Sequence, residues 1–254
     1  GTCNGSQHLC AATLDEEGGY WVNLVPSPNP QDAYGRGTEA VDQKLRPMSD
    51  PLAQMVHPFV SRKTLKQPVM TSNYNVTRIG ARDQIKARLK EQGFPKDDLR
   101  RASMFLANET LGSIGDTFPG PQRLMRWIEE CTKQICLKYP MEGLSWTTPL
   151  GVRCVQPYRK ISTVEVRTVL QRVVLGHRRE DLPVSKGKQR QGGPPNIVHS
   201  WDGCHEMGTA IAMDEEDMDF AAVHDAYWAH ASNMDRLAFH TREQFVEMHE
   251  AGLV

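Results

Sequence analysis

The spacing of apolar side chains changes partway along this chain, and that change most constrains its fold. Up to about residue 140, apolar residues recur at intervals of three and four, for example at Leu124, Ile128 and Cys131, which is typical of helices with one buried face. Later, two short apolar runs flank Pro149-Leu150-Gly151, which predicts a β-hairpin, and 164–170 alternates as a strand does. Helices followed by short strands favour a helix-rich α+β fold.

Capping residues and helix breakers set the expected helix boundaries. Ser61 can cap a helix that begins at Arg62, and Gly93 can end a helix that begins near Arg78. Pro68 lies inside the first of these helices and is expected to kink it. The helices expected in the chain cover 31–45, 62–74, 78–92, a segment around 99–106, a segment around 124–135, and 233–250.

Three further signals place breaks and turns. Phe118-Pro119-Gly120-Pro121 predicts a break between two packed helices, and Gly192-Gly193-Pro194-Pro195 predicts a break before a helix that starts near Asn196. Apolar runs at 220–223 and 226–228 are joined by His224 and Asp225, which predicts a strand, a turn and a second strand. The turn would lift one carboxylate out of an apolar sheet.

The composition favours a globular chain outside the membrane. Apolar residues make up 39% and charged residues 24% of 254 residues, and no apolar run reaches the 18 or more residues that a membrane span needs. The first residues show no secretory pattern. The six cysteines form no CxxC pair, so we interpret them as reduced thiols rather than as zinc ligands or disulfides.

The net charge of -1 hides a strong asymmetry along the chain. Residues 62–101 hold 11 Lys and Arg against 4 Asp and Glu, and residues 153–190 hold 10 against 3. From residue 201 onward the sign reverses, with 2 Arg against 12 Asp and Glu. Two basic stretches beside an acidic one suit a protein that binds polyanions and cations in different regions, although solvated charged faces give the same pattern.

Two groups of residues could carry chemistry. Arg62, Lys66 and Tyr74 share one face of the expected helix, where two cations and a phenol suit a triphosphate and its sugar; the alternative is a solvated basic face. Asp225 lies in the turn between the two expected strands and offers a hard oxygen ligand for a divalent ion, which nucleotidyl transfer needs. A single aspartate cannot hold two metal ions. The alternative is that Asp225 serves only to form the turn.

A third group, His199, Asp202 and His205, follows at intervals of three residues. That spacing could hold zinc, but it drifts around a helix and no fourth ligand is evident. Hydrogen bonding to the protein or to a nucleic acid is the favoured interpretation. The sequence contains no Walker A loop, no GxGxxG and no GxSxG, which argues against P-loop, dinucleotide and α/β-hydrolase chemistry.

Taken together and in order, these segments resemble the single-subunit, bacteriophage-type RNA polymerases of mitochondria, chloroplasts and phages. The resemblance covers essentially the whole chain, and 79–86 with Tyr227-Trp228 favours the organellar, plant-like branch. The segments that carry it are Gly1-Thr2-Cys3-Asn4-Gly5-Ser6-Gln7-His8, 22–27, Gln31-Asp32-Ala33-Tyr34, 62–74, 146–151, Val155-Gln156-Pro157-Tyr158, Pro194-Pro195-Asn196-Ile197-Val198-His199-Ser200 and Val223-His224-Asp225-Ala226-Tyr227-Trp228.

The resemblance implies a palm-and-fingers architecture with a small antiparallel palm sheet. Residues 1–60 and 191–254 would form the palm, and 61–190 the fingers. It also implies two Mg²⁺ ions, with Asp225 as one of two metal-binding aspartates and the Gly1 carbonyl beside the other. That second aspartate would directly precede Gly1 and so lie outside the sequence, which leads us to expect that the chain alone is inactive.

The resemblance also implies roles in nucleotide handling. Arg62 and Lys66 would bind the incoming triphosphate, Lys66 would assist departure of pyrophosphate, and Tyr74 would check the ribose 2'-hydroxyl. The catalytic residues expected are thus Asp225, Lys66 and His224, with His224 beside the metals. Tyr34 would line the nucleotide site, and His199 would touch the growing RNA end. Pro68, Asn73 and Asn75 depart from the family pattern, Asn75 standing where a glycine is usual.

The function that follows is DNA-directed RNA synthesis in an organelle, either the mitochondrion or the plastid, by a nuclear-encoded enzyme whose transit peptide lies outside this chain. Its expected partners are a DNA template, the RNA product, nucleoside triphosphates and organellar transcription factors, and no membrane. Two alternatives stay open: a non-catalytic, nucleic-acid-binding remnant of such a polymerase, and a purely structural role.

Overall fold

The computed structural model describes residues 5–178 and 180–250, and most of them are helical. The helices are α1 (Gly5–Ala12), α2 (Glu16–Trp21), α3 (Ala33–Leu45), α4 (Pro51–Val56), α5 (Arg62–Ser72), α6 (Arg78–Glu91), α7 (Leu99–Thr117), α8 (Pro119–Lys138), α9 (Lys186–Asp214) and α10 (Met234–Glu250), with 3₁₀ turns at His57–Phe59 and Ala231–Asn233. The strands are β1 (Ser145–Thr147), β2 (Arg153–Val155), β3 (Ile161–Arg167), β4 (Arg172–Arg178), β5 (Ala221–Val223) and β6 (Ala226–Trp228).

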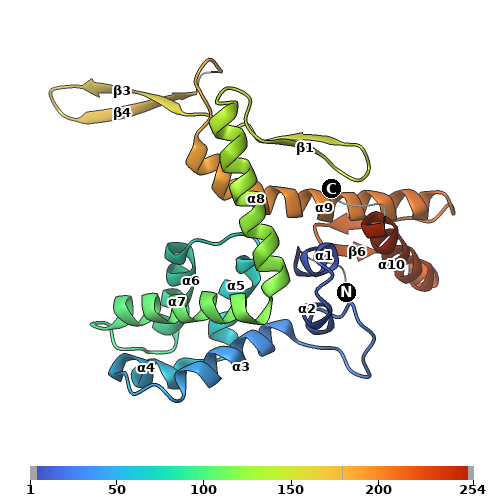
Figure 1. Cartoon of the computed structure of the whole chain (residues 1–254), viewed down its shortest axis with the longest axis horizontal. Coiled ribbons are helices and arrows are strands. Elements are labelled where there is room, and N and C mark those ends of the chain that lie inside the picture. The colour runs from blue at the N-terminus through green and yellow to red at the C-terminus, as the bar shows by residue number, and fades with distance from the viewer. Residues whose placement is uncertain (1–4, 179, 251–254) are drawn as a thin grey trace.

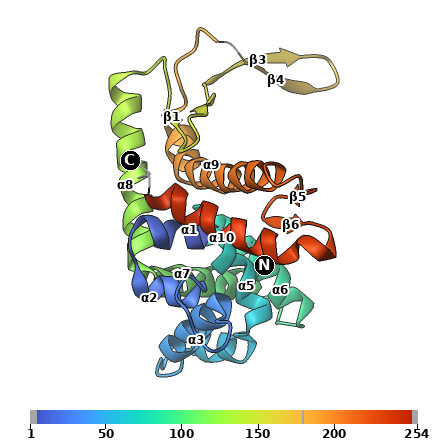
Figure 2. The ribbon, with the colours of Figure 1, turned by 90° about the vertical axis from the view of Figure 1, so that its right-hand side faces the viewer.

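Within these residues the strands pair as separate antiparallel hairpins, β1 with β2, β3 with β4, and β5 with β6. The expected helix-rich α+β class with small antiparallel sheets is therefore confirmed. The β3–β4 hairpin projects away from the helices in both views (Figures 1 and 2). Its strand β3 ends at Arg167, because 168–171 form the turn, so the strand expected over 164–170 is shorter at its end than predicted.

Helices α3 to α7 pack together around one hydrophobic core (Figure 1). Fully buried aliphatic side chains from each helix fill this core, among them Val41, Leu65, Ile85 and Leu106. The expected capping residues act here as predicted: the Ser61 hydroxyl accepts a hydrogen bond from the Thr64 backbone N–H at the start of α5, and Gly93 follows α6 with a φ of +79°.

A second apolar cluster joins α1, α8, α9 and α10. Leu9, Met125, Val198 and Met248 come together there from these four helices. Figure 1 shows α8 rising from the end of α7, and α8 packs mainly on α9 rather than on α7. The predicted break between two helices at Phe118 is confirmed, and it is a single residue long because the prolines at the start of α8 suit the first helical turn. The expectation that these two helices pack on each other was wrong.

The break expected at Gly192-Gly193-Pro194-Pro195 was also wrong, because α9 runs through it without interruption. Close packing offsets the loss of helical hydrogen bonds. A Cβ atom at Gly193 would lie 2.8 Å from the Thr132 hydroxyl of α8, so the glycine permits this contact. Pro195 has no N–H for the Gln191 carbonyl, and the Asn75 side-chain amide donates to that carbonyl instead, at 3.2 Å.

The helix α5 departs from expectation at both Pro68 and its end. Pro68 is buried within a continuous helix, and α5 ends at Ser72, so Tyr74 lies in the following turn and not on the helical face of Arg62 and Lys66. The next residue, Asn75, has a φ of +56°, a left-handed conformation that asparagine tolerates better than most residues. No helix in the described ranges is both long and apolar enough to cross a membrane.

Candidate active site

Two cations of α5 meet the aromatic ring of Tyr34 at the start of α3. The Arg62 guanidinium carbon lies 5.6 Å and the Lys66 ammonium 5.7 Å from the centre of that ring. Arg62 also donates to the carboxylate of Asp32 at 2.6 Å, and this hydrogen bond is the main reason that the pKa of Asp32 lies below its usual value. Asp32 in turn caps α3 by accepting from the Tyr34 backbone N–H.

Lys66 differs from Arg62 in having no carboxylate partner among the residues that the structure describes. Its side chain is exposed, so its charge is free to meet an anion. The structure therefore brings Arg62 and Lys66 together with Tyr34, which the resemblance had placed at the same nucleotide site. Asp32 is an addition that the sequence pattern did not assign. The sequence indicates only that Asp32 can cap the helix that follows it. That position does not predict an ion pair with Arg62, thirty residues further along the chain.

Tyr74 is held by contacts from two directions. Its ring stacks on the imidazole of His199, with ring centres 4.4 Å apart and planes 2° from parallel. Its hydroxyl accepts a hydrogen bond from the Gly5 backbone N–H at 3.3 Å. Burial, followed by the nearby carboxylates of Asp202 and Asp225, raises the pKa of the phenol to about 12. Tyr74 thus presents a neutral hydroxyl at neutral pH.

The β5–β6 hairpin carries Asp225 in the predicted tight turn. Val223 pairs with Ala226, which leaves His224 and Asp225 as the turn, and His224 takes a left-handed φ of +55°. Asp225 is exposed and has no ion-pair partner in the described part of the chain. Its charge contributes to the raised pKa of Tyr34, after burial, and to that of Tyr74. Asp225 therefore lies close enough to both tyrosines for its charge to act on them.

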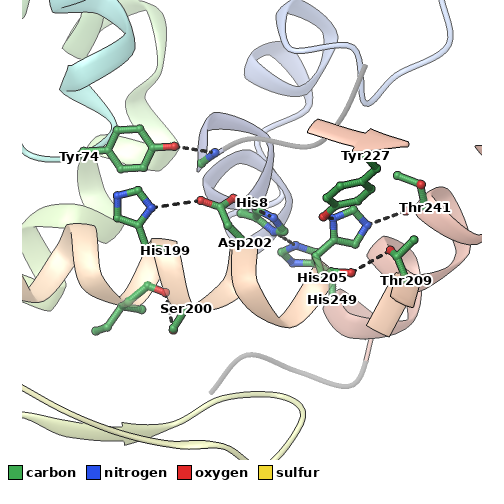
Figure 3. A network of polar contacts seen from close by, with 12 residues as sticks. His8, Tyr74, His199, Ser200, Asp202, His205, Thr209, Tyr227, Thr241 and His249 are labelled. Carbon is green, nitrogen blue, oxygen red and sulfur yellow. Dashed lines mark hydrogen bonds and ion pairs between the residues drawn. The ribbon is translucent and has the colours of Figure 1, made fainter. Parts of the chain in front are cut away.

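His199 lies on α9 with its side chain 59% exposed, and its Nδ1 is 3.6 Å from Asp202. Figure 3 shows the His199 ring against the Tyr74 ring, with its contact to Asp202 on the side of the imidazole edge. His205 points elsewhere, since its Nε2 lies 2.7 Å from the Thr241 carbonyl oxygen. The group of His199, Asp202 and His205 therefore does not converge on one point. Gly1, the other predicted metal neighbour, lies outside the described residues.

The candidate site thus contains the cations of Arg62 and Lys66 and the phenols of Tyr34 and Tyr74. It also contains the carboxylates of Asp32 and Asp225, both of which act on Tyr34. The contributing segments are the turn before α3, helix α5 with its following turn, helix α9 and the β5–β6 turn. Helices α1 and α9 pack on each other, and both contact Tyr74, α1 through Gly5 and α9 through His199. This packing brings segments that are far apart in sequence to the same site. The cations suit the phosphates of a ligand, the phenols suit the hydroxyl groups of its sugar, and a carboxylate suits a divalent cation bound with it.

Comparison with known proteins agrees with this chemistry. The family of DNA-dependent RNA polymerases matches residues 1–254, so the chain belongs to that family. It is 44% identical over 266 residues to the protein named DNA-directed RNA polymerase 1, mitochondrial, of Nicotiana sylvestris, and 43% identical over 265 residues to DNA-directed RNA polymerase 2A of Nicotiana tabacum. It is 42% identical over 265 residues to DNA-directed RNA polymerase 3, chloroplastic, of Nicotiana sylvestris.

Each of these matches covers 100% of this chain, but a different share of the relative's own length. The chain spans 26% of the mitochondrial relative, 27% of the chloroplastic one and 79% of polymerase 2A. The match thus establishes the family for this segment, and the residues of the candidate site lie within it.

Proposed function

We propose that this chain forms the nucleotide-adding centre of a DNA-directed RNA polymerase that works in mitochondria or plastids. The observation that carries the proposal is the placement of Arg62 and Lys66 over the Tyr34 ring, in a chain that belongs to the RNA polymerase family. Asp225 lies close enough to Tyr34 and Tyr74 to act on both electrostatically. The organelle is inferred from the names of the relatives, which are mitochondrial or chloroplastic. In this proposal residues 1–60 and 191–254 form the palm, and 61–190 the fingers.

The residues of the site would divide the work as their chemistry suggests. Arg62 and Lys66 would bind the triphosphate of the incoming nucleotide, because both cations point over the same ring and Lys66 lacks an acidic partner in the described residues. Lys66 would also balance the negative charge on the departing pyrophosphate. Tyr34 would line the nucleotide pocket beneath the two cations. The base itself would be selected by pairing with the DNA template.

Tyr74 and His199 would contact the sugar and the growing RNA end. The Tyr74 hydroxyl is neutral and already near a backbone donor, so it can exchange that contact for a ribose 2'-hydroxyl. His199 supports the Tyr74 ring and keeps an exposed side of its own.

Asp225 fits the requirement for one Mg²⁺ ligand, because it is an exposed carboxylate on a tight turn, with no ion-pair partner among the described residues. Those residues contain no group of three His, Cys, Asp or Glu side chains placed to hold a metal, so Asp225 alone does not complete a site. The chemistry that bound Mg²⁺ supplies in nucleotidyl transfer is charge neutralisation and activation of a hydroxyl. His224, in the same turn, would lie beside that ion.

The partners that follow from this proposal are a DNA template, an RNA product, nucleoside triphosphates and organellar transcription factors. A non-catalytic, nucleic-acid-binding remnant is the competing function. Such a remnant would keep the basic surface but would have no specific nucleotide site. The nucleotide-binding experiment described next distinguishes the two functions.

Nucleotide binding by this chain tests the proposal. We expect ATP with Mg²⁺ to bind, and Lys66→Ala or Arg62→Ala to weaken binding by about tenfold or more, since a charged hydrogen bond contributes roughly 1.5 to 3 kcal/mol. Lys63→Ala is the matched control, because Lys63 is exposed on the same helix without a described contact to Tyr34. Equal affinity in all three variants, with nucleic-acid binding retained, would favour the remnant.

A further inference from the structure

A polar network extends from one side of the Tyr74–His199 stack, and Asp202 connects the stack to it (Figure 3). One carboxylate oxygen of Asp202 lies 3.6 Å from His199 Nδ1, and the other lies 3.3 Å from His8 Nε2. His8 is fully buried on α1, whereas the Asp202 side chain keeps 21% of its surface exposed. Asp202 therefore stands between an exposed histidine at the candidate site and a buried histidine in the core.

The hydrogen-bond partners determine which nitrogens of these imidazoles carry protons. His8 Nε2 lies at an ion-pair distance from the Asp202 carboxylate, and neither of the two facing atoms has a hydrogen-bond partner in the described residues. A carboxylate can only accept, so the tautomer that suits this contact carries its proton on Nε2. His8 Nδ1 lies 3.0 Å from His249 Nε2, and this contact is satisfied when His249 donates. Burial is the main cause that lowers the pKa of His249 to about 4, so His249 is neutral and has one proton to give. The chain of contacts thus runs from His249 through His8 to Asp202.

The neighbouring His205 does not compete for Asp202. Its Nε2 donates to the Thr241 carbonyl at 2.7 Å, and its Nδ1 lies 3.4 Å from the Tyr227 hydroxyl. Both nitrogens are therefore occupied by other groups. The two oxygens of Asp202 are left to His8 and His199. Burial acts to raise the pKa of Asp202, but the two neighbouring imidazoles together outweigh burial and keep that pKa below its usual value.

His199 has few other restraints. Its side chain is 59% exposed, so in the described residues its orientation depends on the stack with Tyr74 and on Asp202. A surface imidazole without a partner samples several rotamers, and ordering it costs free energy. A carboxylate anchored from behind by a buried histidine removes that freedom.

We propose that Asp202 is a positioning residue, which holds His199 flat against Tyr74 while His8 fixes the carboxylate from the protein interior. The importance of this for nucleotide handling rests on the function proposed above, but the positioning itself does not. The proposal predicts a defined proton position: His199 should carry its proton on Nδ1, directed at Asp202.

Nitrogen-15 NMR of the histidine side chains in this chain tests the proposal without any substitution. The expected result is a His199 ring protonated at Nδ1, with nuclear Overhauser contacts to the Tyr74 ring. A neutral His199 that carries its proton on Nε2, with Nδ1 bare, would overturn it, because a bare Nδ1 cannot donate to Asp202.

A substitution then tests cause. Asp202→Asn offers one acceptor oxygen and one amide donor, so it cannot satisfy both imidazoles, and we expect His199 to lose its Nδ1 tautomer and its contacts to Tyr74. Glu206→Gln is the matched control: Glu206 lies one turn further along α9 and makes no ion pair in the described residues, so it should leave His199 unchanged. An undisturbed His199 in Asp202→Asn would overturn the proposal, and if this variant does not fold, the wild-type proton position still decides.

The consequence for the site is measured separately, as the ratio of ATP to dATP affinity. We expect Asp202→Asn to reduce this ratio as His199→Ala does, by about 2- to 10-fold, the effect of one hydrogen bond. If NMR shows His199 released while neither variant changes the ratio, the positioning holds and the proposed contact of this site with the sugar is wrong.

Discussion

At the level of single residues, the candidate site is built from side chains whose neighbours come from distant segments. Tyr74 contacts Gly5 through its hydroxyl and His199 through its ring, and Arg62 bonds to Asp32. The residue types of Arg62, Lys66 and Tyr74 allowed a nucleotide site to be predicted from the sequence, but only together with the resemblance to the polymerase family, because a solvated basic face gives the same pattern. Their partners could not be predicted, because a contact across such separations depends on how whole helices pack.

Tyr74 allows a sharp prediction about sugar selection. Removing only the hydroxyl in Tyr74→Phe should keep the stack on His199 and most ATP affinity. The preference for ATP over dATP should shrink by about 2- to 10-fold, because one hydrogen bond is lost. The measurement is competition binding to this chain. Equal preference in wild type and Tyr74→Phe would show that the phenol does not sense the sugar.

The partly buried His249 and the buried His205 predict a loss of stability in acid. His249 has a pKa of about 4 in the folded chain and an ordinary value of 6.5, and burial also lowers the pKa of His205. A histidine whose pKa is lower in the folded chain than in the unfolded chain binds a proton more readily in the unfolded chain. Protonation therefore favours unfolding. Its contribution to stability is therefore present above pH 6.5 and is lost as pH falls toward 4.

For His249 this loss is on the order of 1 to 3 kcal/mol, read from chemical denaturation at several pH values. His249→Gln should flatten the curve over that range, because glutamine can still donate to His8 but does not titrate. His230→Gln is the control, since His230 is 70% exposed. Identical slopes for the wild type and His249→Gln would contradict this assignment.

At the level of helices and strands, local signals succeeded where the chain itself encodes the boundary. The Ser61 cap, the Gly93 helix end and the His224-Asp225 turn were all predicted from a few adjacent residues and are confirmed. The helix α9 was not, because its prolines are tolerated only through contacts made by α8 and by the turn after α5. The local sequence cannot predict that a helix will continue through two prolines when the groups that replace its lost hydrogen bond and pack against it come from distant segments.

Asn75 is the residue that makes this compensation measurable. Its side-chain amide donates to Glu129 at 2.7 Å and to the Gln191 carbonyl that Pro195 leaves without a helical partner, at 3.2 Å. Asn75→Gly keeps the left-handed backbone but removes both bonds. We expect the free energy of unfolding to fall by about 1 to 3 kcal/mol.

Leu14→Gly is the matched control for the backbone contribution. Leu14 also has a left-handed φ, of +50°, and its side chain is 91% exposed. Glycine relieves the same strain there without breaking a side-chain bond, so we expect stability to stay equal or to rise. If Asn75→Gly behaved like Leu14→Gly in urea denaturation, the two bonds would contribute nothing to the junction of α5, α8 and α9.

Across the molecule as a whole, charge is segregated along the chain. The segments 62–101 and 153–190 are basic, and the segment from residue 201 onward is acidic. In the fold the first includes α5 and α6 and the second includes the projecting β3–β4 hairpin, while the acidic segment carries Asp225. We predict that the two basic segments face a common groove that binds nucleic acid.

That prediction is tested by the salt dependence of binding to a primed template. Affinity should fall steeply as salt rises, with a slope of log affinity against log salt that decreases by roughly 0.7 to 0.9 for each phosphate contact removed. The double variant Arg153→Ala and Lys160→Ala should reduce the slope, and Arg242→Ala, in the acidic segment, should not. A binding constant indifferent to salt would refute the shared basic surface.

Whether this chain forms a nucleotide-adding centre is decided by RNA extension with a chimaera, in which the chain replaces the matching region of the Nicotiana sylvestris mitochondrial relative. With Mg²⁺ and a primed DNA template, we expect addition of the complementary ribonucleotide, lost in Asp225→Asn and reduced in Lys66→Ala. A chimaera that folds and binds the template but adds no nucleotide, or one that extends equally well with Asp225→Asn, would contradict the proposed function.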